Sequence, residues 1–360
     1  MMIEDLRGKA VLITGGTMGI GLATGLAFGR QGAHCILTHK WGTADEDEVR
    51  ARFAEVGAPE PLIVQADVAD DADTTALLEA VRARHHAIEA FISNVSVALV
   101  VKDLEEYEKR SLFKSIEYSA WPMVEYTRRI KEVFGRYPRY VVGLSSGGPD
   151  AFYQNYDFAA AAKAVLETLC RYLNYRLFDE DVRVNVVRSR LVRTESLRAT
   201  FGRDFEEFAE RFNMKRQFIA CEEVADVIVA LCSGLLDGVS GQVIMVDRGT
   251  SFFDNLMRLY SARRARHLKK EHNAMTREQI LSVVTKHLVD ALDDLDPAAI
   301  DTSQSMKDLG ANSLDIVEVV SRTMRELKIK VPRSELAKLT NIDALVDLLY
   351  QVAREQARAA

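Results

Sequence analysis

The chain has 360 residues, of which 48% are hydrophobic and 28% charged, and it carries a formal net charge of -6. This balance supplies enough apolar side chains for a buried core and excludes disordered and fibrous proteins. The negative charge argues against a protein that coats nucleic acid, because no overall positive field would attract phosphates. At about 150 residues per domain, the length predicts two domains, or one large domain with an appendage.

The sequence indicates no membrane segment, secretion signal or metal site. No run reaches the roughly 18 apolar residues of a spanning helix, and acidic residues stand where a signal peptide needs basic ones. The cysteines lack the paired spacing of a zinc or disulfide framework. His85 and His86 are adjacent and would point in different directions on a helix. We therefore predict a cytoplasmic protein that binds no metal, no nucleic acid and no membrane.

Short apolar runs that predict buried strands recur through the first two thirds of the chain. They occupy residues 10–14, 34–38, 62–66, 89–93, 139–145, 182–187 and 242–246. Longer segments between them, such as 70–85 and 154–179, have the apolar spacing of helices. Because strands and helices alternate, the sequence predicts an α/β fold with a Rossmann-type doubly wound parallel sheet over residues 1–255.

The pattern changes after residue 250. Six basic side chains and one acidic side chain occur between Met257 and Met275, which predicts a basic linker over residues 256–275. Helical spacing then recurs over residues 277–292, 313–328 and 341–356. Residues 276–360 are therefore expected to form a separate, small all-α helical-bundle domain.

A glycine-rich segment follows the first predicted strand directly and opens a helix. It reads Thr14-Gly15-Gly16-Thr17-Met18-Gly19-Ile20-Gly21. Glycines allow a tight turn and the close approach of a pyrophosphate, whose charge then lies at the N–H groups of the helix start. The segment predicts a dinucleotide site, and its cofactor-binding residues are expected to be Gly15, Thr17, Met18, Gly19, Ile20 and Gly21.

The spacing TGxxxGxG resembles the short-chain dehydrogenase/reductase superfamily, and further similarities follow in chain order over residues 6–252. They are an adenine-contacting pair after the third strand, an asparagine after the fourth, a threonine after the sixth, and the last strand itself. Through these positions the resemblance implies four further cofactor-binding residues: Asp67, Val68, Asn94 and Thr194.

The second predicted strand is followed by Lys40, and no acidic residue lies there to hold the ribose 2′-hydroxyl of NADH. A lysine at this place can pair with a 2′-phosphate. NADPH is therefore the expected cofactor, and Lys40 is the residue expected to select it. The alternative is a lysine in a solvated loop without such a role.

The superfamily's usual signature is a tyrosine four residues before a lysine, with a serine further upstream. Here Lys163 has Ala159 at that position, and Tyr156 instead lies seven residues before the lysine. Two helical turns separate Tyr156 from Lys163, so both side chains are predicted to lie on one helical face. The Tyr-x6-Lys spacing, with Leu144-Ser-Ser-Gly147 upstream, resembles enoyl-acyl-carrier-protein reductase III.

This resemblance implies NADPH-dependent reduction of the double bond of an α,β-unsaturated acyl thioester. In the implied mechanism Tyr156 stabilises an oxyanion as hydride arrives, while Lys163 holds the nicotinamide ribose and lowers the pKa of the phenol. Ser146 completes the implied catalytic set, because it occupies the position of the superfamily's serine. The superfamily also implies a homodimer or homotetramer formed through this domain.

The helical tail contains the segment Asp308-Leu-Gly-Ala-Asn-Ser313-Leu-Asp-Ile-Val-Glu318. It resembles the acyl carrier protein motif, whose serine at the start of the second helix carries 4′-phosphopantetheine; Asn312 makes it similar to carriers of polyketide assembly lines. A helix start tolerates a phosphodiester because its N–H groups are free and carry partial positive charge. The resemblance implies covalent 4′-phosphopantetheine on Ser313, and as partners a phosphopantetheinyl transferase and other fatty-acid or polyketide synthase enzymes. An unmodified helix cap is the alternative role of Ser313.

The helix that begins near Ser313 is predicted to be amphipathic. Five apolar side chains recur at helical spacing and are expected to face the interior: Leu314, Val317, Val320, Met324 and Leu327. Asp315 and Glu318 are expected to stay outside as a docking face.

Two alternative functions remain open on the sequence. Ser146 occupies the usual serine position of ketoreductases, which favours a β-ketoacyl-acyl-carrier-protein reductase, although Ala159 replaces the tyrosine of that enzyme class. The other alternative is a degenerate reductase scaffold that presents a carrier domain to partner enzymes. Two departures motivate it: residues 111–120 lack the superfamily's asparagine, and Ser189-Arg190 replaces its Pro-Gly.

Overall fold

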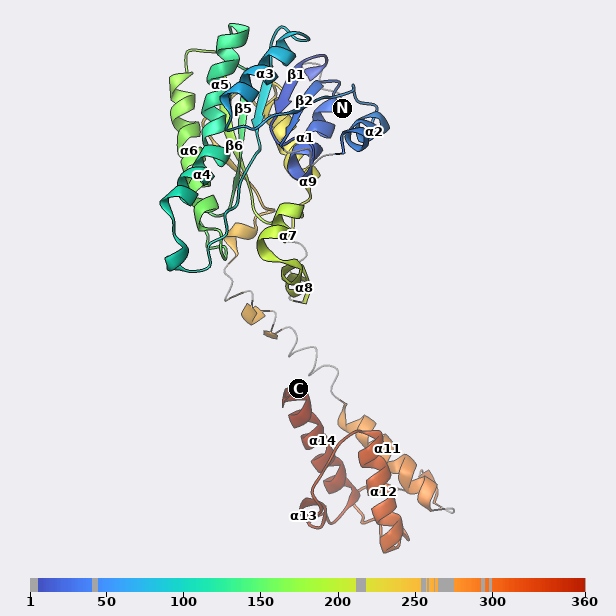
Figure 1. Ribbon diagram of the computed structural model, residues 1–360. Coiled ribbons are helices and arrows are strands. Elements are labelled where there is room, and N and C mark those ends of the chain that lie inside the picture. Colours follow the sequence, from blue (N-terminus) through green and yellow to red (C-terminus); the bar gives the residue numbers. More distant parts are fainter. Residues whose placement is uncertain are drawn as a thin grey trace. The chain divides into compact units, whose positions relative to one another are not determined.

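A computed structural model describes residues 6–40, 45–211, 218–253, 257, 259–261, 263–264, 275–292, 295–297 and 300–359. The chain divides into two compact units, Met1–Phe252 and Phe253–Ala360 (Figure 1). The division falls close to the predicted boundary at residue 255, and most of the predicted linker, residues 256–275, lies outside the described residues. Each unit has its own buried apolar core.

The first unit is built on a sheet of seven parallel strands in the order β3-β2-β1-β4-β5-β6-β7. The strands are β1 (Ala10–Ile13), β2 (His34–His39), β3 (Leu62–Gln65), β4 (Ala90–Ser93), β5 (Tyr140–Ser146), β6 (Arg183–Ser189) and β7 (Val243–Val246). Each overlaps one of the predicted apolar runs. β1 and β4 are buried along their whole length, as expected for strands covered on both faces. The predicted Rossmann-type doubly wound sheet is confirmed.

Helices cover both faces of this sheet (Figure 1). One apolar core lies under α1 (Gly19–Arg30), α2 (Glu46–Glu55) and α9 (Cys221–Leu231). The core of the opposite face lies under α3 (Asp71–Arg82), α4 (Lys109–Ser119), α5 (Trp121–Phe134) and α6 (Asp157–Arg176). Two further helices, α7 (Glu195–Phe201) and α8 (Arg203–Arg211), follow β6 and pack around a smaller apolar cluster.

The strand order reverses between β1 and β4, which are hydrogen-bonded neighbours although the chain visits β2 and β3 between them. The loops that leave these two strands therefore run to opposite sides of the sheet. In open parallel sheets such a reversal creates a crevice at the carboxyl ends of the strands, where ligands bind. The glycine-rich segment follows β1 and Asn94 follows β4, so both lie at this crevice.

The second unit contains α11 (Arg277–Ala291), α12 (Ser313–Glu326), α13 (Arg333–Leu336) and α14 (Ile342–Ala359). Its core includes Ile280, Val284, Val319 and Val346, all fully buried. α11 begins with a capping box, in which the Thr276 side chain accepts a hydrogen bond from the backbone N–H of Gln279 at 3.2 Å. The predicted small helical-bundle domain is confirmed.

The predicted apolar face of α12 is wrong at its first two positions. Leu314 is 80% exposed and Val317 is 62% exposed. Val319 and Thr323, which are fully buried, face the interior instead, together with Leu327. Helical spacing does not distinguish an apolar face that packs inside a domain from one that lies on its surface.

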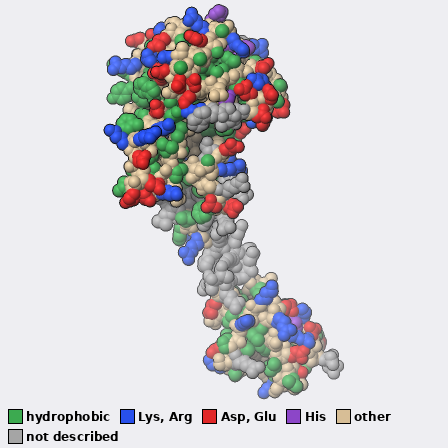
Figure 2. Space-filling view, viewed as in Figure 1, with side chains coloured by type: hydrophobic (Ala, Val, Ile, Leu, Met, Phe, Trp, Pro, Cys, Tyr) green, Lys and Arg blue, Asp and Glu red, His purple; other side chains and the backbone are tan. Residues whose placement is uncertain are grey.

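Acidic and basic side chains are interspersed over the visible face of the first unit (Figure 2). Within the part of the chain that the structure describes, no helix is long and apolar enough to cross a membrane. The same described residues contain no group of three or more histidine, cysteine or carboxylate side chains that could hold a metal ion.

Candidate active site

A pocket of about 920 Å³ opens at the carboxyl ends of β1, β4, β5 and β6. Ten residues expected to bind cofactor or to take part in catalysis line it: Gly15, Thr17, Met18, Gly19, Ile20, Asn94, Ser146, Tyr156, Lys163 and Thr194. The pocket lining does not include Gly21, Lys40, Asp67 or Val68. Residues as distant in the sequence as Gly15 and Thr194 thus line one cavity.

The glycine-rich segment has the geometry of a phosphate cradle. Gly15 and Gly19 have positive φ angles of 62° and 53°. A Cβ atom at Gly21 would lie 2.1 Å from the carbonyl oxygen of Gly15, so only glycine fits there. The residue before α1, Met18, makes no side-chain cap, and the first turn contains no acidic residue. The helix start therefore presents backbone N–H groups, which suits a dinucleotide pyrophosphate.

Asn94 holds this segment in place. Its Nδ2 atom donates hydrogen bonds to the carbonyl oxygens of Thr14 and Gly15, each at 3.0 Å. Its backbone N–H donates to Thr14 Oγ1 at 3.1 Å. Asn94 therefore shapes the cofactor site by bracing the glycine loop, in addition to lining the pocket.

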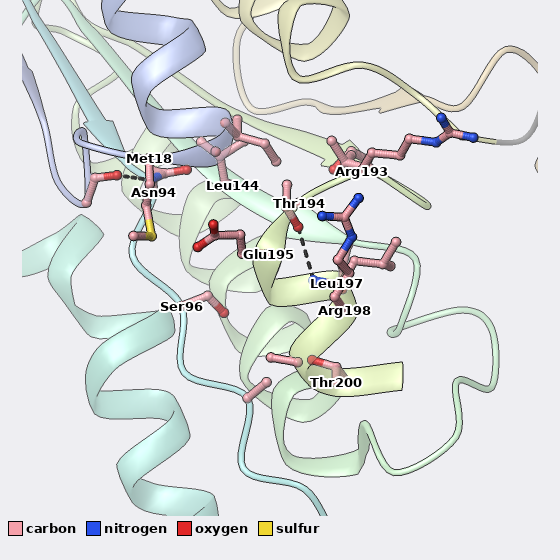
Figure 3. A pocket seen from close by; sticks show the side chains of 18 of the residues that line it. Met18, Asn94, Ser96, Leu144, Arg193, Thr194, Glu195, Leu197, Arg198 and Thr200 are labelled. Atoms are coloured by element: carbon pink, nitrogen blue, oxygen red, sulfur yellow. Dashed lines mark hydrogen bonds between the residues drawn. The ribbon is translucent and has the colours of Figure 1, made fainter. Parts of the chain in front are cut away.

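Thr194 forms part of the pocket wall beside the glycine loop. Its Oγ1 atom accepts a hydrogen bond from the backbone N–H of Leu197 at 3.1 Å and so caps α7. Figure 3 shows Thr194 and Leu197 across the pocket from Met18 and Asn94. A Cβ atom at Gly19 would lie 3.6 Å from the Thr194 methyl carbon, so α7 begins beside the glycine loop.

Lys40 follows β2, where it forms an ion pair with Asp67 and donates a hydrogen bond to the Tyr118 hydroxyl at 2.7 Å. Tyr118, from α4, donates in turn to Asp67 Oδ2 at 3.0 Å. Burial acts to raise the pKa of Asp67, but hydrogen bonds from Lys40, the Ala69 N–H and Tyr118 hold it below its ordinary value. Any 2′-phosphate at this place would share the Lys40 ammonium with a carboxylate. The Val68 side chain is buried in the core.

Tyr156 lies immediately before α6, whose first residue is Asp157, and its φ of -109° and ψ of 12° are not helical. The prediction that Tyr156 and Lys163 occupy one face of a helix is therefore wrong for Tyr156, although both line the same pocket. Burial raises the pKa of the Tyr156 phenol, while a hydrogen bond with the Ser146 side chain acts to lower it. The predicted catalytic residues Tyr156 and Ser146 thus lie close together in the pocket.

Lys163 is buried on α6, and its Nζ atom donates a hydrogen bond to the Leu144 carbonyl oxygen at 2.7 Å. Burial lowers the pKa of Lys163 to about 8, against the attraction of the Glu167 carboxylate one turn further along the helix. Glu167 accepts hydrogen bonds from Ser145 Oγ at 2.6 Å and from Arg188 Nε at 2.8 Å. The Lys163 ammonium is therefore held in position by the Leu144 carbonyl, and burial brings its pKa well below the ordinary value.

Tyr153 and Arg190 also line the pocket, and neither was predicted to belong to the site. The Arg190 Nε atom donates a hydrogen bond to the Tyr153 hydroxyl at 3.1 Å. The Tyr153 ring lies 6.0 Å from the Tyr156 ring, centroid to centroid, and each lies 6.3 Å from the ring of Phe201 on α7. The replacement of Pro-Gly by Ser-Arg after the sixth strand was the sequence signal for Arg190.

In the second unit, Ser313 is exposed and is the first residue of α12. The cap is Asn312, whose side chain accepts hydrogen bonds from the N–H groups of Leu314 at 2.7 Å and Asp315 at 3.1 Å. The Asp315 carboxylate accepts in return from the Asn312 N–H at 2.9 Å. Because Asn312 supplies the cap, the alternative role of Ser313 as the helix cap is excluded.

Comparison with known families matches both units. Residues 15–251 match the family described as enoyl-(acyl carrier protein) reductase, and residues 282–349 match the phosphopantetheine attachment site. The enoyl-acyl-carrier-protein reductase (NADH) of Aquifex aeolicus is 27% identical over 254 residues, covering 68% of this chain and 92% of the relative. The 1-cyclohexenylcarbonyl-CoA reductase of Streptomyces collinus is 26% identical over 249 residues, covering 68% and 88%.

Solved structures show the same fold. The Bacillus cereus enoyl-acyl carrier protein reductase, in complex with NADP+ and indole naphthyridinone, has a TM-score of 0.62 at 24% identity and covers 71% of this chain and 100% of its own. The L-sorbose reductase of Gluconobacter frateurii, in complex with NADPH and L-sorbose, has a TM-score of 0.60 at 22% identity, covering 68% and 97%. Fold, pocket and matched residues together lead to one assignment. The chain belongs to the enoyl-(acyl carrier protein) reductase family, within the short-chain dehydrogenases/reductases, and carries a C-terminal phosphopantetheine-attachment domain.

Proposed function

We propose that the first unit reduces the double bond of an α,β-unsaturated acyl thioester carried on phosphopantetheine, with NADPH as the reductant. One observation carries this proposal: a single pocket combines the glycine loop with Tyr156 and Lys163, in a chain that also has a phosphopantetheine-attachment domain. The names of the Aquifex and Streptomyces relatives both specify reduction of an enoyl thioester, which supports the same reaction here.

Each of the predicted catalytic residues has a different role in this reaction. The bound dinucleotide supplies hydride to the β carbon of the substrate. Negative charge then develops on the thioester carbonyl oxygen, to which the Tyr156 hydroxyl donates a hydrogen bond. Ser146 directs the phenol through the hydrogen bond between their side chains. Lys163 holds positive charge at the pocket floor, where it attracts the cofactor and orients its ribose.

The pKa of Lys163 predicts how cofactor binding depends on pH. We expect NADPH affinity to fall as the pH rises through about 8, because Lys163 is charged below this value and loses its proton above it. Fluorescence titration of the NADPH dissociation constant between about pH 6 and about pH 10 measures the effect. Lys163→Met is the control: it should bind more weakly and without this pH step. A step of equal size in the variant would assign the titration to another group.

The preference for NADPH is proposed from the charge that follows β2. Lys40→Ala removes an ammonium and leaves the Asp67 carboxylate without its ion-pair partner, although the Tyr118 hydroxyl and the Ala69 N–H still donate to it. We expect NADPH affinity to fall about tenfold, as for loss of one charge-assisted hydrogen bond, and NADH affinity to change less. Lys131→Ala is a matched control, since Lys131 also contacts a tyrosine ring, at 5.0 Å, but lies in the last turn of α5. Equal losses for both cofactors in Lys40→Ala would refute a 2′-phosphate role.

A β-ketoacyl reductase is the second candidate, because Ser146 and the Tyr156 phenol line the same pocket, as a serine and a tyrosine do in that enzyme class. The two reactions place negative charge on different atoms. Enoyl reduction places it on the thioester oxygen, whereas keto reduction places it on an oxygen of the β carbon. Substrate preference therefore decides between the two candidates.

For the second unit we propose covalent 4′-phosphopantetheine on Ser313, added by a phosphopantetheinyl transferase, and docking to other synthase enzymes. The exposed Leu314 and Val317 follow Ser313 on the surface of α12 and support a docking role for this helix.

For the first unit we propose a homo-oligomer. Its support is a set of exposed aromatic side chains on or just after α6: Tyr172, Tyr175 and Phe178.

A further inference from the structure

The Arg190 guanidinium has hydrogen-bonding capacity that the protein does not use. Arg190 is half-buried, lines the pocket and donates from Nε to the Tyr153 hydroxyl. Its two terminal nitrogens have no hydrogen-bond partner among the described residues. Asp247 attracts it through space, but the carboxylate of Asp247 is occupied by the backbone N–H groups of Gly249 at 2.8 Å and Ser251 at 2.6 Å. Four N–H donors therefore remain for a ligand.

The surroundings of Arg190 favour an anionic ligand. The rings of Tyr153, Tyr156 and Phe201 form an aromatic wall, with neighbouring centroids 6.0 to 6.3 Å apart. Asp247 supplies one opposite charge through space without a hydrogen bond to the guanidinium, so the partly buried charge and free N–H donors of Arg190 can still gain from an anion in the pocket. Because Tyr153 accepts a hydrogen bond from Arg190, its own hydroxyl proton is available to donate to the same anion.

The position of Arg190 separates this ligand from the cofactor pyrophosphate. The pyrophosphate cradle follows β1, whereas Arg190 follows β6, and β4 and β5 lie between them. Three strand spacings amount to about 14 Å. The chain from Arg190 to Thr194 returns toward the glycine loop, so it is Thr194 that adjoins the cradle, while Arg190 stays beside Tyr153. Arg190 therefore lies at the end of the pocket that holds Tyr156.

We infer that Arg190, with Tyr153, recognises a carboxylate on the acyl chain of the substrate, so that the preferred substrate is an enoyl thioester of a dicarboxylic acid. A guanidinium binds a carboxylate through two parallel hydrogen bonds, which fixes the direction of the chain as well as its charge. This inference rests on the proposed function, because it names the class of acyl chain that the same site accepts.

The test compares two pantetheine thioesters of nearly equal shape. Glutaconyl-pantetheine carries the carboxylate, and 5-methylhex-2-enoyl-pantetheine replaces its two oxygens by methyl groups. Pantetheine is used because the phosphates of coenzyme A would themselves attract arginines. We expect the wild type to prefer the glutaconyl substrate in kcat/KM by about ten- to a hundredfold, the range for charge-assisted hydrogen bonds. Arg190→Gln should abolish this preference, mainly through KM, and Arg190→Lys should retain part of it.

Arg193→Gln is the matched control. Arg193 lines the same pocket, but its guanidinium lies over the Phe218 ring at 5.1 Å, and Figure 3 shows its side chain directed away from Met18 and Asn94. In Arg193→Gln the ratio of kcat/KM for the glutaconyl substrate to kcat/KM for the methylhexenoyl substrate should equal that of the wild type. Equal wild-type rates with both substrates, or a ratio unchanged in Arg190→Gln, would overturn the inference. So would a loss of NADPH affinity in Arg190→Gln with no change in the ratio.

A binding measurement separates this inference from the proposed reaction. Glutaryl-pantetheine is saturated and cannot be reduced, so its affinity for the NADPH-loaded full chain reports recognition alone. We expect calorimetry to show binding that weakens about tenfold or more in Arg190→Gln. If neither enoyl substrate is reduced while glutaryl-pantetheine still binds through Arg190, the proposed reaction fails and the recognition stands. If glutaryl-pantetheine binds equally to wild type and variant, the recognition fails.

Discussion

Tyr156→Phe is expected to lower turnover with crotonyl-pantetheine by about a hundredfold or more, because removal of one oxyanion donor from a preorganised site costs this much. NADPH affinity should stay within about twofold of the wild type, since the phenol acts on the substrate oxygen and the ring remains in place. NADPH oxidation at saturating substrate measures the first quantity, and fluorescence titration of the cofactor measures the second.

The control for this variant is Tyr350→Phe, which removes a hydroxyl from α14 of the second unit, at a residue that does not line the pocket. Its turnover should equal that of the wild type.

The same assay with acetoacetyl-pantetheine decides between the two reductase functions. Faster oxidation of NADPH with the keto substrate would establish the β-ketoacyl reductase, and NADPH binding without either activity would favour the scaffold.

Ser313→Ala is expected to abolish attachment of 4′-phosphopantetheine completely, because no other hydroxyl stands at the start of α12. The full chain is incubated with coenzyme A and a phosphopantetheinyl transferase, and intact mass spectrometry shows whether one arm is added. The substitution should leave the fold of the second unit unchanged, because Asn312, and not Ser313, caps the helix through Leu314 and Asp315.

Ser321→Ala is the matched control, since Ser321 lies on the same helix about two turns further along. This variant should accept one arm, as the wild type does. Modification of Ser313→Ala, or a wild type that several transferases leave unmodified, would contradict the carrier assignment for this serine.

The parts of the structure that could be predicted from the sequence are those fixed by local chemistry. A buried parallel strand needs a continuous apolar run, so β1 and β4 could be predicted as buried strands from their sequences. The glycine loop could be predicted as a dinucleotide site because glycines at a turn from a strand directly into a helix are typical of such sites. Ser146, Tyr156 and Lys163 were found through a spacing, and they do line one pocket.

The remaining features depend on contacts between segments that are distant in the sequence. Lys40 meets Asp67 because they follow the neighbouring strands β2 and β3, and it meets Tyr118 because α4 reaches the same edge of the sheet. Tyr153 comes from the irregular segment between β5 and α6, where no periodicity indicates direction, and it reaches Arg190 across the pocket. The Ser-Arg pair at the end of β6 was interpreted as a departure from a family pattern, although its arginine also lines the pocket.

Because an asparagine caps α12, the hydrogen bonds of this cap at the start of the helix do not depend on pH. The Asn312 amide has no proton to gain or lose between acidic and alkaline solution, whereas an aspartate in its place would lose its acceptor strength when protonated. An aspartate would also set a second carboxylate, besides Asp315, next to the phosphodiester that we propose on Ser313. Asn312 would avoid this repulsion of the proposed arm, and its own hydrogen bonds to the N–H groups of Leu314 and Asp315 do not depend on pH.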